Sequence, residues 1–118
     1  MPESLELLKG TLDVLILKTL SWEPLHGYGI SKALRSATAD TFQVEEGALY
    51  PALRRLEKRG LLEAEWGTTE TGREARFYRL TPAGRASLER DVRAWSRYVE
   101  AMARVLFADG PRGDEVGR

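Results

Sequence analysis

The chain has 118 residues, a formal net charge of zero, 42% hydrophobic residues and no cysteine. That size and composition fit one globular domain and exclude a disordered chain, a disulfide framework and a thiolate metal site. The N-terminus is acidic where a signal peptide is basic, and the apolar run LDVLILKTL is far too short to span a membrane. We therefore expect a cytoplasmic protein with no membrane partner.

The charges are unevenly distributed. Residues 1–46 contain four basic and seven acidic residues, whereas residues 47–90 contain nine basic and six acidic ones. Phosphate binding depends on a local basic patch and not on the total charge. The neutral total therefore does not exclude a nucleic-acid partner.

The chain begins with a predicted helix over residues 4–21. Its leucines recur at helical spacing, and Leu7, Val14 and Leu17 add a second apolar face that could contact another chain. Residues 22–27 are predicted to be a connector, because Pro24 disfavours helix for the residue before it.

A short helix over residues 28–37 and a loop over residues 38–44 come next, with room for a very short strand at 42–44. His26 is the only histidine. We expect it in the connector, tying the first two helices together through backbone hydrogen bonds. One imidazole with no acidic cluster beside it does not predict a metal site.

The stretch EGALYPALRRLEKRGLL predicts a third helix that ends at Gly60, since glycine tolerates a positive φ. Its leucines form one apolar stripe. At about 100° per residue, the face away from that stripe carries Arg54, Arg55 and Lys58. Tyr50 falls between the two faces.

The period then changes from helical to twofold. LLEAEWGT and REARFYRL predict two strands of a hairpin, separated by residues 69–72. The residues expected on the inward face are Leu62, Trp66, Tyr78 and Leu80. Arg73 and Arg76 lie close to Gly72 at the predicted tip.

A long last helix begins cleanly, because Thr81 can cap it and Pro82 suits its first turn. Its apolar residues follow alternating spacings of four and three, which is the pattern of a heptad seam. These residues are Leu88, Val92, Trp95, Val99, Met102 and Leu106. The short helices can hardly cover a helix of this length, so we interpret the seam as a dimer interface. Residues 109–118 are Gly-rich and polar, and we expect a disordered tail there.

This order of elements predicts a mainly α fold with a small β-hairpin: a winged helix-turn-helix domain over residues 1–81 and a dimerisation helix over 82–108. In a helix-turn-helix fold the recognition helix enters the major groove of DNA. The runner-up hypothesis is a winged-helix module for protein–protein contact without DNA binding, which would carry an acidic or apolar outer face on the third helix. No catalytic constellation and no cofactor motif is present, so an enzyme is not expected.

Four stretches of the sequence resemble the PadR family of bacterial transcriptional regulators, in its short form with a single C-terminal helix. They are LLKGTLDVLILKTL, HGYGI, EEGALYPALRRLEKRGLL and GREARFYRLTPAGR. Tyr50 and Pro51 match the Tyr-Pro pair of the family's recognition helix, and Arg73 and Tyr78 match its wing. The resemblance implies a dimeric repressor that binds an inverted-repeat operator in double-stranded DNA and is released by a small molecule.

Each candidate residue has a functional and a structural interpretation. Tyr50 could donate to a phosphate or fill the core edge, and Pro51 could shape the first turn of the third helix or touch DNA. Arg54 and Lys58 favour DNA contact, while Arg55 is evenly balanced between DNA and a solvated face.

The arginines of the predicted hairpin have two interpretations as well. Arg73 and Arg76 could bind DNA, or pair with acidic residues across the hairpin (Glu63, Glu65 or Glu74). On the last helix, Trp95 could wall a cavity for a small aromatic or apolar effector, although packing is its more ordinary role.

Overall fold

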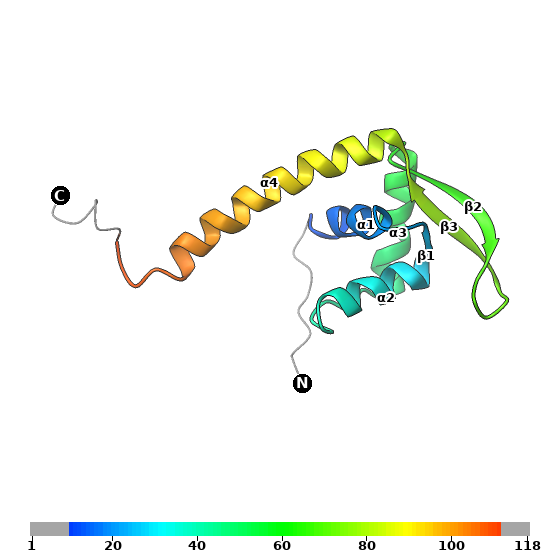
Figure 1. The fold of residues 1–118 in the computed structure, drawn as a ribbon, viewed down its shortest axis with the longest axis horizontal. Coiled ribbons are helices and arrows are strands. Elements are labelled where there is room, and N and C mark those ends of the chain that lie inside the picture. The colour runs from blue at the N-terminus through cyan, green and yellow to red at the C-terminus, as the bar shows by residue number, and fades with distance from the viewer. Residues whose placement is uncertain (1–9, 112–118) are drawn as a thin grey trace.

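A computed structural model describes residues 10–111 of the chain. Its first part comprises α1 (Leu12–Leu20), β1 (Leu25–His26), α2 (Gly27–Ala37) and α3 (Glu46–Lys58). Its second part comprises β2 (Leu62–Thr68), β3 (Glu74–Leu80) and α4 (Pro82–Leu106). In Figure 1, α4 runs away from the domain on one side, and the β2–β3 hairpin, which we call the wing, projects on the other. The predicted winged helix-turn-helix fold with a long C-terminal helix is confirmed.

The first helix is shorter than predicted. Residues 4–9, including Leu7, lie outside the described residues, and Gly10 and Thr11 form a turn. Gly10 has a φ of +88°, which does not fit a right-handed helix, so α1 begins at Leu12. At the other end of the chain, most of the predicted tail (residues 112–118) also lies outside the described residues.

The sheet has one strand more than predicted. Its order is β1–β3–β2, all antiparallel, with Leu25 opposite Tyr78. His26 therefore lies in a strand and not in a loop, but it does bind backbone: its Nδ1 accepts from the N–H of Gly29 at 3.2 Å and so caps α2. The very short strand considered at residues 42–44 does not form, and Phe42 makes only an isolated β-bridge.

The core lies between the first three helices, the base of the wing and the start of α4. The predicted stripe on α3 is fully buried there, at Leu49, Leu53 and Leu56. The prediction for Trp66 was wrong, because this residue is 69% exposed. It follows the same alternation as Leu62, but it stands where the wing has already extended past the core.

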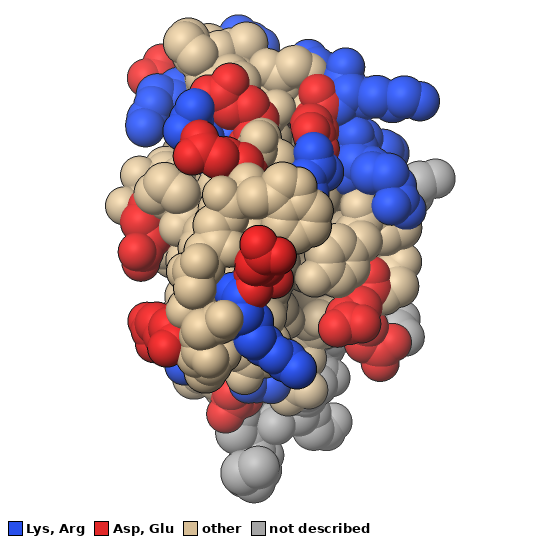
Figure 2. Space-filling model, turned by 90° about the vertical axis from the view of Figure 1, so that its right-hand side faces the viewer, with Lys and Arg blue, Asp and Glu red and all other residues tan. Residues whose placement is uncertain are grey.

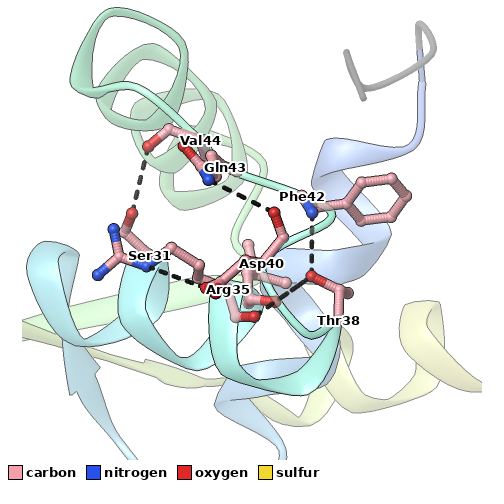
Figure 3. A network of polar contacts seen from close by, with 8 residues as sticks. Ser31, Arg35, Thr38, Asp40, Phe42, Gln43 and Val44 are labelled. Atoms are coloured by element: carbon pink, nitrogen blue, oxygen red, sulfur yellow. Dashed lines mark hydrogen bonds and ion pairs between the residues drawn. The ribbon is translucent and has the colours of Figure 1, made fainter. Parts of the chain in front are cut away.

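The turn between α2 and α3 is held by side-chain to backbone hydrogen bonds (Figure 3). Thr38 Oγ1 donates to the carbonyl of Leu34 at 2.8 Å and accepts from the N–H of Phe42 at 3.0 Å. Ala39 and Asp40 have φ values of 48° and 66°, a left-handed conformation that costs L-residues energy. These contacts fix the direction in which the chain enters α3.

The start of α4 is fixed to the end of α3. Thr81 Oγ1 accepts from the N–H of Gly84 at 3.0 Å and donates to the carbonyl of Gly60 at 2.6 Å. The carbonyl of Leu61 accepts from the N–H of Thr81 at 3.1 Å. The predicted cap by Thr81 is therefore confirmed. The same residue also links the end of α3 to the start of α4, which the wing separates in the sequence.

Candidate nucleic-acid interface

An open hollow of about 590 Å³ lies where the outer face of α3 meets the wing. It is lined by Pro51, Arg54, Arg55, Glu57, Lys58 and Arg76. Five of these six residues were predicted from the sequence as DNA-binding candidates. The structure thus brings residues from two separate segments to one concave surface.

The two basic residues of α3 for which the sequence favours DNA contact have no carboxylate partner in the described part of the chain. Arg54 and Lys58 are exposed, and neither forms an ion pair with any residue between 10 and 111. Both charges are therefore available to a phosphate or a base edge. Their backbone is held by the buried leucines on the opposite face of α3.

Arg55 has a different environment. Its Nη2 donates to Asp13 Oδ1 of α1 at 3.0 Å, with side-chain exposures of 58% and 29%. The sequence favoured neither DNA contact nor a solvated face for Arg55. In the structure Arg55 has a structural role, since its ion pair with Asp13 joins α3 to α1. Nothing in the local sequence indicates this contact, because the partners are 42 positions apart.

Arg76 reaches from β3 onto α3. Its two terminal nitrogens donate to the two carboxylate oxygens of Glu57, at 3.2 and 2.9 Å. The cross-hairpin pairing considered for Arg76 does not form. Arg79 instead binds Glu63 at 2.8 Å and approaches Glu65 at 3.8 Å. Glu57 is thus a residue of the site that the sequence analysis missed.

Arg73 lies beyond the hollow, at the tip of the wing. Gly72 has a φ of +85°, and the N–H of Arg73 donates to Thr69 Oγ1 at 3.2 Å. Within the described part of the chain, the Arg73 guanidinium forms no ion pair. The tip therefore presents one unpaired positive charge on a tight turn.

Tyr50 lies at the edge of α3, 39% exposed, with its ring against Gly27 at the start of α2. A Cβ at Gly27 would come within 2.8 Å of the ring carbon that bears the hydroxyl, so only glycine leaves room for this ring. Partial burial, then the charge of Glu46 and the neighbouring Tyr78, raise the pKa of Tyr50. The hydroxyl is therefore a neutral donor at physiological pH.

Pro51 lies in the second turn of α3, because the helix begins at Glu46. The prediction that it shapes the first turn was therefore wrong. A proline there has no N–H to donate to the carbonyl of Gly47, four residues earlier. Glu45, the residue before the helix, forms no side-chain cap. The start of α3 is consequently held by the preceding turn and by core packing.

The face that carries the wing has charges of both signs. Figure 2 shows basic and acidic side chains interspersed over it, with the largest group of basic side chains at the upper right. This mixed surface fits the modest local excess of positive charge seen in the sequence. Phosphate binding at this face therefore depends on individual basic side chains more than on a uniformly positive electrostatic potential.

The predicted seam of α4 is largely uncovered in the single chain. Val92, Val99, Met102 and Leu106 are exposed, and Trp95 is half-buried with its ring edge-on to Tyr98 at 5.4 Å. Leu88 requires a correction: it is 7% exposed and belongs to the core of its own chain. The first turns of α4 cover the domain, and the free apolar surface begins at Val92.

The described helices include none that is long and apolar enough to cross a membrane, and no three His, Cys, Asp or Glu side chains gather as a metal site within residues 10–111. A recognition helix beside a wing, with cationic residues at their junction, defines the class of winged helix-turn-helix DNA-binding proteins. Residues 16–90 match the transcriptional regulator PadR-like family. The chain belongs to this family.

Several proteins similar to the chain are transcriptional regulators. It is 37% identical to the transcriptional regulator Rv3488 of Mycobacterium tuberculosis over 86% of this chain and 88% of that protein. A transcriptional regulator from Clostridium thermocellum superimposes with a TM-score of 0.74 at 31% identity, covering 83% of this chain and 95% of the other. Bacillus subtilis PadR in complex with operator DNA superimposes with a TM-score of 0.61 at 25% identity, covering 69% of this chain and 46% of that protein.

Proposed function

We propose that the protein binds a specific operator in double-stranded DNA, with α3 in the major groove and the wing tip on the flanking backbone. The observation that carries the proposal is the hollow between α3 and the wing, where Arg54 and Lys58 have no carboxylate partner among residues 10–111. Arginine and lysine at such positions bind guanine edges and phosphates. The operator complex of the related PadR protein supports the same kind of partner.

The test begins with an operator selected from random duplexes by the wild-type protein. Affinity for it should fall steeply with salt, because each neutralised phosphate releases counterions. Arg54→Ala should weaken operator binding by about 1–3 kcal/mol and weaken a scrambled duplex less, since loss of a base contact is sequence-dependent. Failure to select any sequence, or affinity that is independent of salt, would contradict the proposal.

The assembly we propose is a homodimer on an inverted-repeat operator, with residues 1–81 as the DNA-binding domain and residues 82–108 as the dimerisation helix. The exposed apolar surface of α4 supports it, because a helix surface of this kind is normally covered. The interface would comprise Val92, Trp95, Val99, Met102 and Leu106. Figure 1 shows that most of α4 stands clear of the domain and is open to a partner.

We further propose that the dimer is a repressor released by a small aromatic or apolar effector, as the family resemblance implies. The aromatic pair of Trp95 and Tyr98 supports a site on α4, where a flat ligand could stack. A variant with Trp22→Phe and Trp66→Phe keeps Trp95 as its only tryptophan. Its fluorescence should change with an effector that also releases DNA, whereas release without any change would place the effector elsewhere.

The alternative, a protein-binding module, predicts an acidic or apolar outer face on α3. That face instead carries Arg54, Arg55 and Lys58, although Glu57 lies among them. The selection experiment separates the two functions, because a protein-binding module would retain no duplex at all.

A further inference from the structure

Arg76 forms the outermost connection between the wing and α3. In the described part of the chain, no hydrogen bond or ion pair joins α3 to the wing beyond this residue. Arg76 stands directly opposite Trp66, four residues from the buried Leu80 at the base of β3. At about 3.3 Å per residue, the pair lies roughly 13 Å up the wing from that base.

The arginine is held from two sides. Both terminal nitrogens bind the Glu57 carboxylate, and the guanidinium carbon lies 5.8 Å from the centre of the Tyr78 ring. Tyr78 is buried and pairs with Leu25 of β1. The guanidinium thus connects the last turn of α3 with the central strand of the sheet.

A guanidinium bound in this way contributes little to phosphate neutralisation. The carboxylate offsets its charge, and each terminal nitrogen already donates one of its two N–H groups to Glu57. The planar fork of arginine matches a carboxylate in a way that the point charge of lysine cannot. The pair therefore fixes the position of the wing relative to α3 more than it adds positive charge to the interface.

We propose that Glu57 and Arg76 are positioning residues that set the angle between the wing and α3, so that both can contact one operator at once. The pair thereby favours DNA whose groove and backbone match that angle, and acts on specificity instead of on general affinity. This inference rests on the proposed DNA binding. It assigns Arg76 a role different from the direct contact predicted from the sequence.

Three variants separate positioning from direct contact. Arg76→Lys keeps the charge and loses the fork, while Glu57→Gln keeps the shape and loses the carboxylate. The exchange variant with Glu57→Arg and Arg76→Glu restores a forked pair in the opposite direction. Affinity is measured for the selected operator and for a scrambled duplex of equal length, and circular dichroism checks that each variant is folded.

Both single variants should lower the ratio of operator to scrambled affinity by about three- to thirtyfold, a range typical of coupling between contacting residues. The exchange variant should recover most of that ratio. If Arg76→Lys instead keeps the full ratio and the exchange variant loses operator binding, Arg76 contacts DNA directly and the inference is wrong.

The controls keep this failure distinct from failure of the proposed function. If the wild-type protein selects an operator while both single variants retain its full ratio, only the positioning role is overturned. If the wild-type protein prefers no duplex, the proposed function fails, and the inference fails with it. Arg79→Lys is the matched control, because Arg79 pairs with Glu63 within the wing and should leave the ratio unchanged.

Discussion

At the scale of single residues, the basic side chains of the interface fall into two groups: those with no carboxylate partner among residues 10–111, and those that form an ion pair. Arg54, Lys58 and Arg73 have no carboxylate partner in the described chain, whereas Arg55 is bound to Asp13 and Arg76 to Glu57. Exposed ion pairs contribute at most about 1 kcal/mol to folding, so their main effect here is on where the side chains point. The free cations are therefore the ones expected to contact DNA.

Tyr50 gives a test at this scale. Tyr50→Phe keeps the ring that packs on Gly27 and removes only the hydroxyl, which has no hydrogen-bond partner in residues 10–111. Thermal stability should stay nearly unchanged, while operator affinity should fall by about 0.5–1.5 kcal/mol, the value of one hydrogen bond.

Melting curves and binding titrations on the same preparation distinguish the two interpretations of Tyr50. Tyr28→Phe is the control, because Tyr28 is an exposed tyrosine of α2 and should change neither quantity. A lower melting temperature with unchanged affinity would make Tyr50 a core-edge residue.

At the scale of elements, the packing of α4 on the α3–β2 junction leaves no space for a side chain at Gly84. A Cβ there would overlap the carbonyl oxygen of Leu61, which is backbone and cannot rotate away. Gly84→Ala should therefore destabilise the protein by about 1–3 kcal/mol, as overpacking does. Urea unfolding measures this change directly.

Gly47→Ala is the control, because it should change the free energy of unfolding in the opposite direction to Gly84→Ala. Gly47 lies in α3 with open space around its Cβ position and no positive φ. Gly47→Ala should stabilise the protein by about 0.5–1 kcal/mol, because alanine loses less backbone entropy in a helix. If Gly84→Ala is neutral or stabilising as well, α4 does not sit on Leu61 as closely as the structure shows.

At the scale of the whole molecule, the proposed dimer gives a prediction for Val99. This residue is 57% exposed in the single chain, so Val99→Asp should leave the folding of the protomer nearly intact. In a dimer it would bury an unpaired charge, which costs several kcal/mol and is enough to abolish a modest interface. Operator affinity should collapse with the dimer, because two linked half-sites bind far more tightly than one.

Sedimentation and operator titration test this prediction. Ala101→Asp is the matched control, since Ala101 is exposed on the opposite side of α4 and the same aspartate there should leave the dimer intact. A Val99→Asp protein that stays dimeric would place the interface away from the exposed apolar residues of α4. The second apolar face predicted for the first helix does not offer a replacement among the described residues, because Leu17 is buried in the core and Val14 packs against it.

The sequence by itself determined the elements whose signals are local. The stripe of Leu49, Leu53 and Leu56 fixed α3, twofold alternation fixed the wing, and Thr81 with Pro82 fixed the start of α4. These patterns act through neighbours one turn or one pleat away, so they can be recognised without the fold. Together with the family resemblance, which singled out Pro51, these patterns identified five of the six residues that line the hollow.

Only the tertiary structure decided the contacts between distant segments. The two-residue strand β1 exists because β3 offers it an edge, and Trp66 is exposed because the wing is longer than the core beneath it. Arg76 meets Glu57 across 19 positions, and Arg55 meets Asp13 across 42. No local pattern encodes such pairs, since a side chain finds its partner only after packing has placed the two backbones side by side.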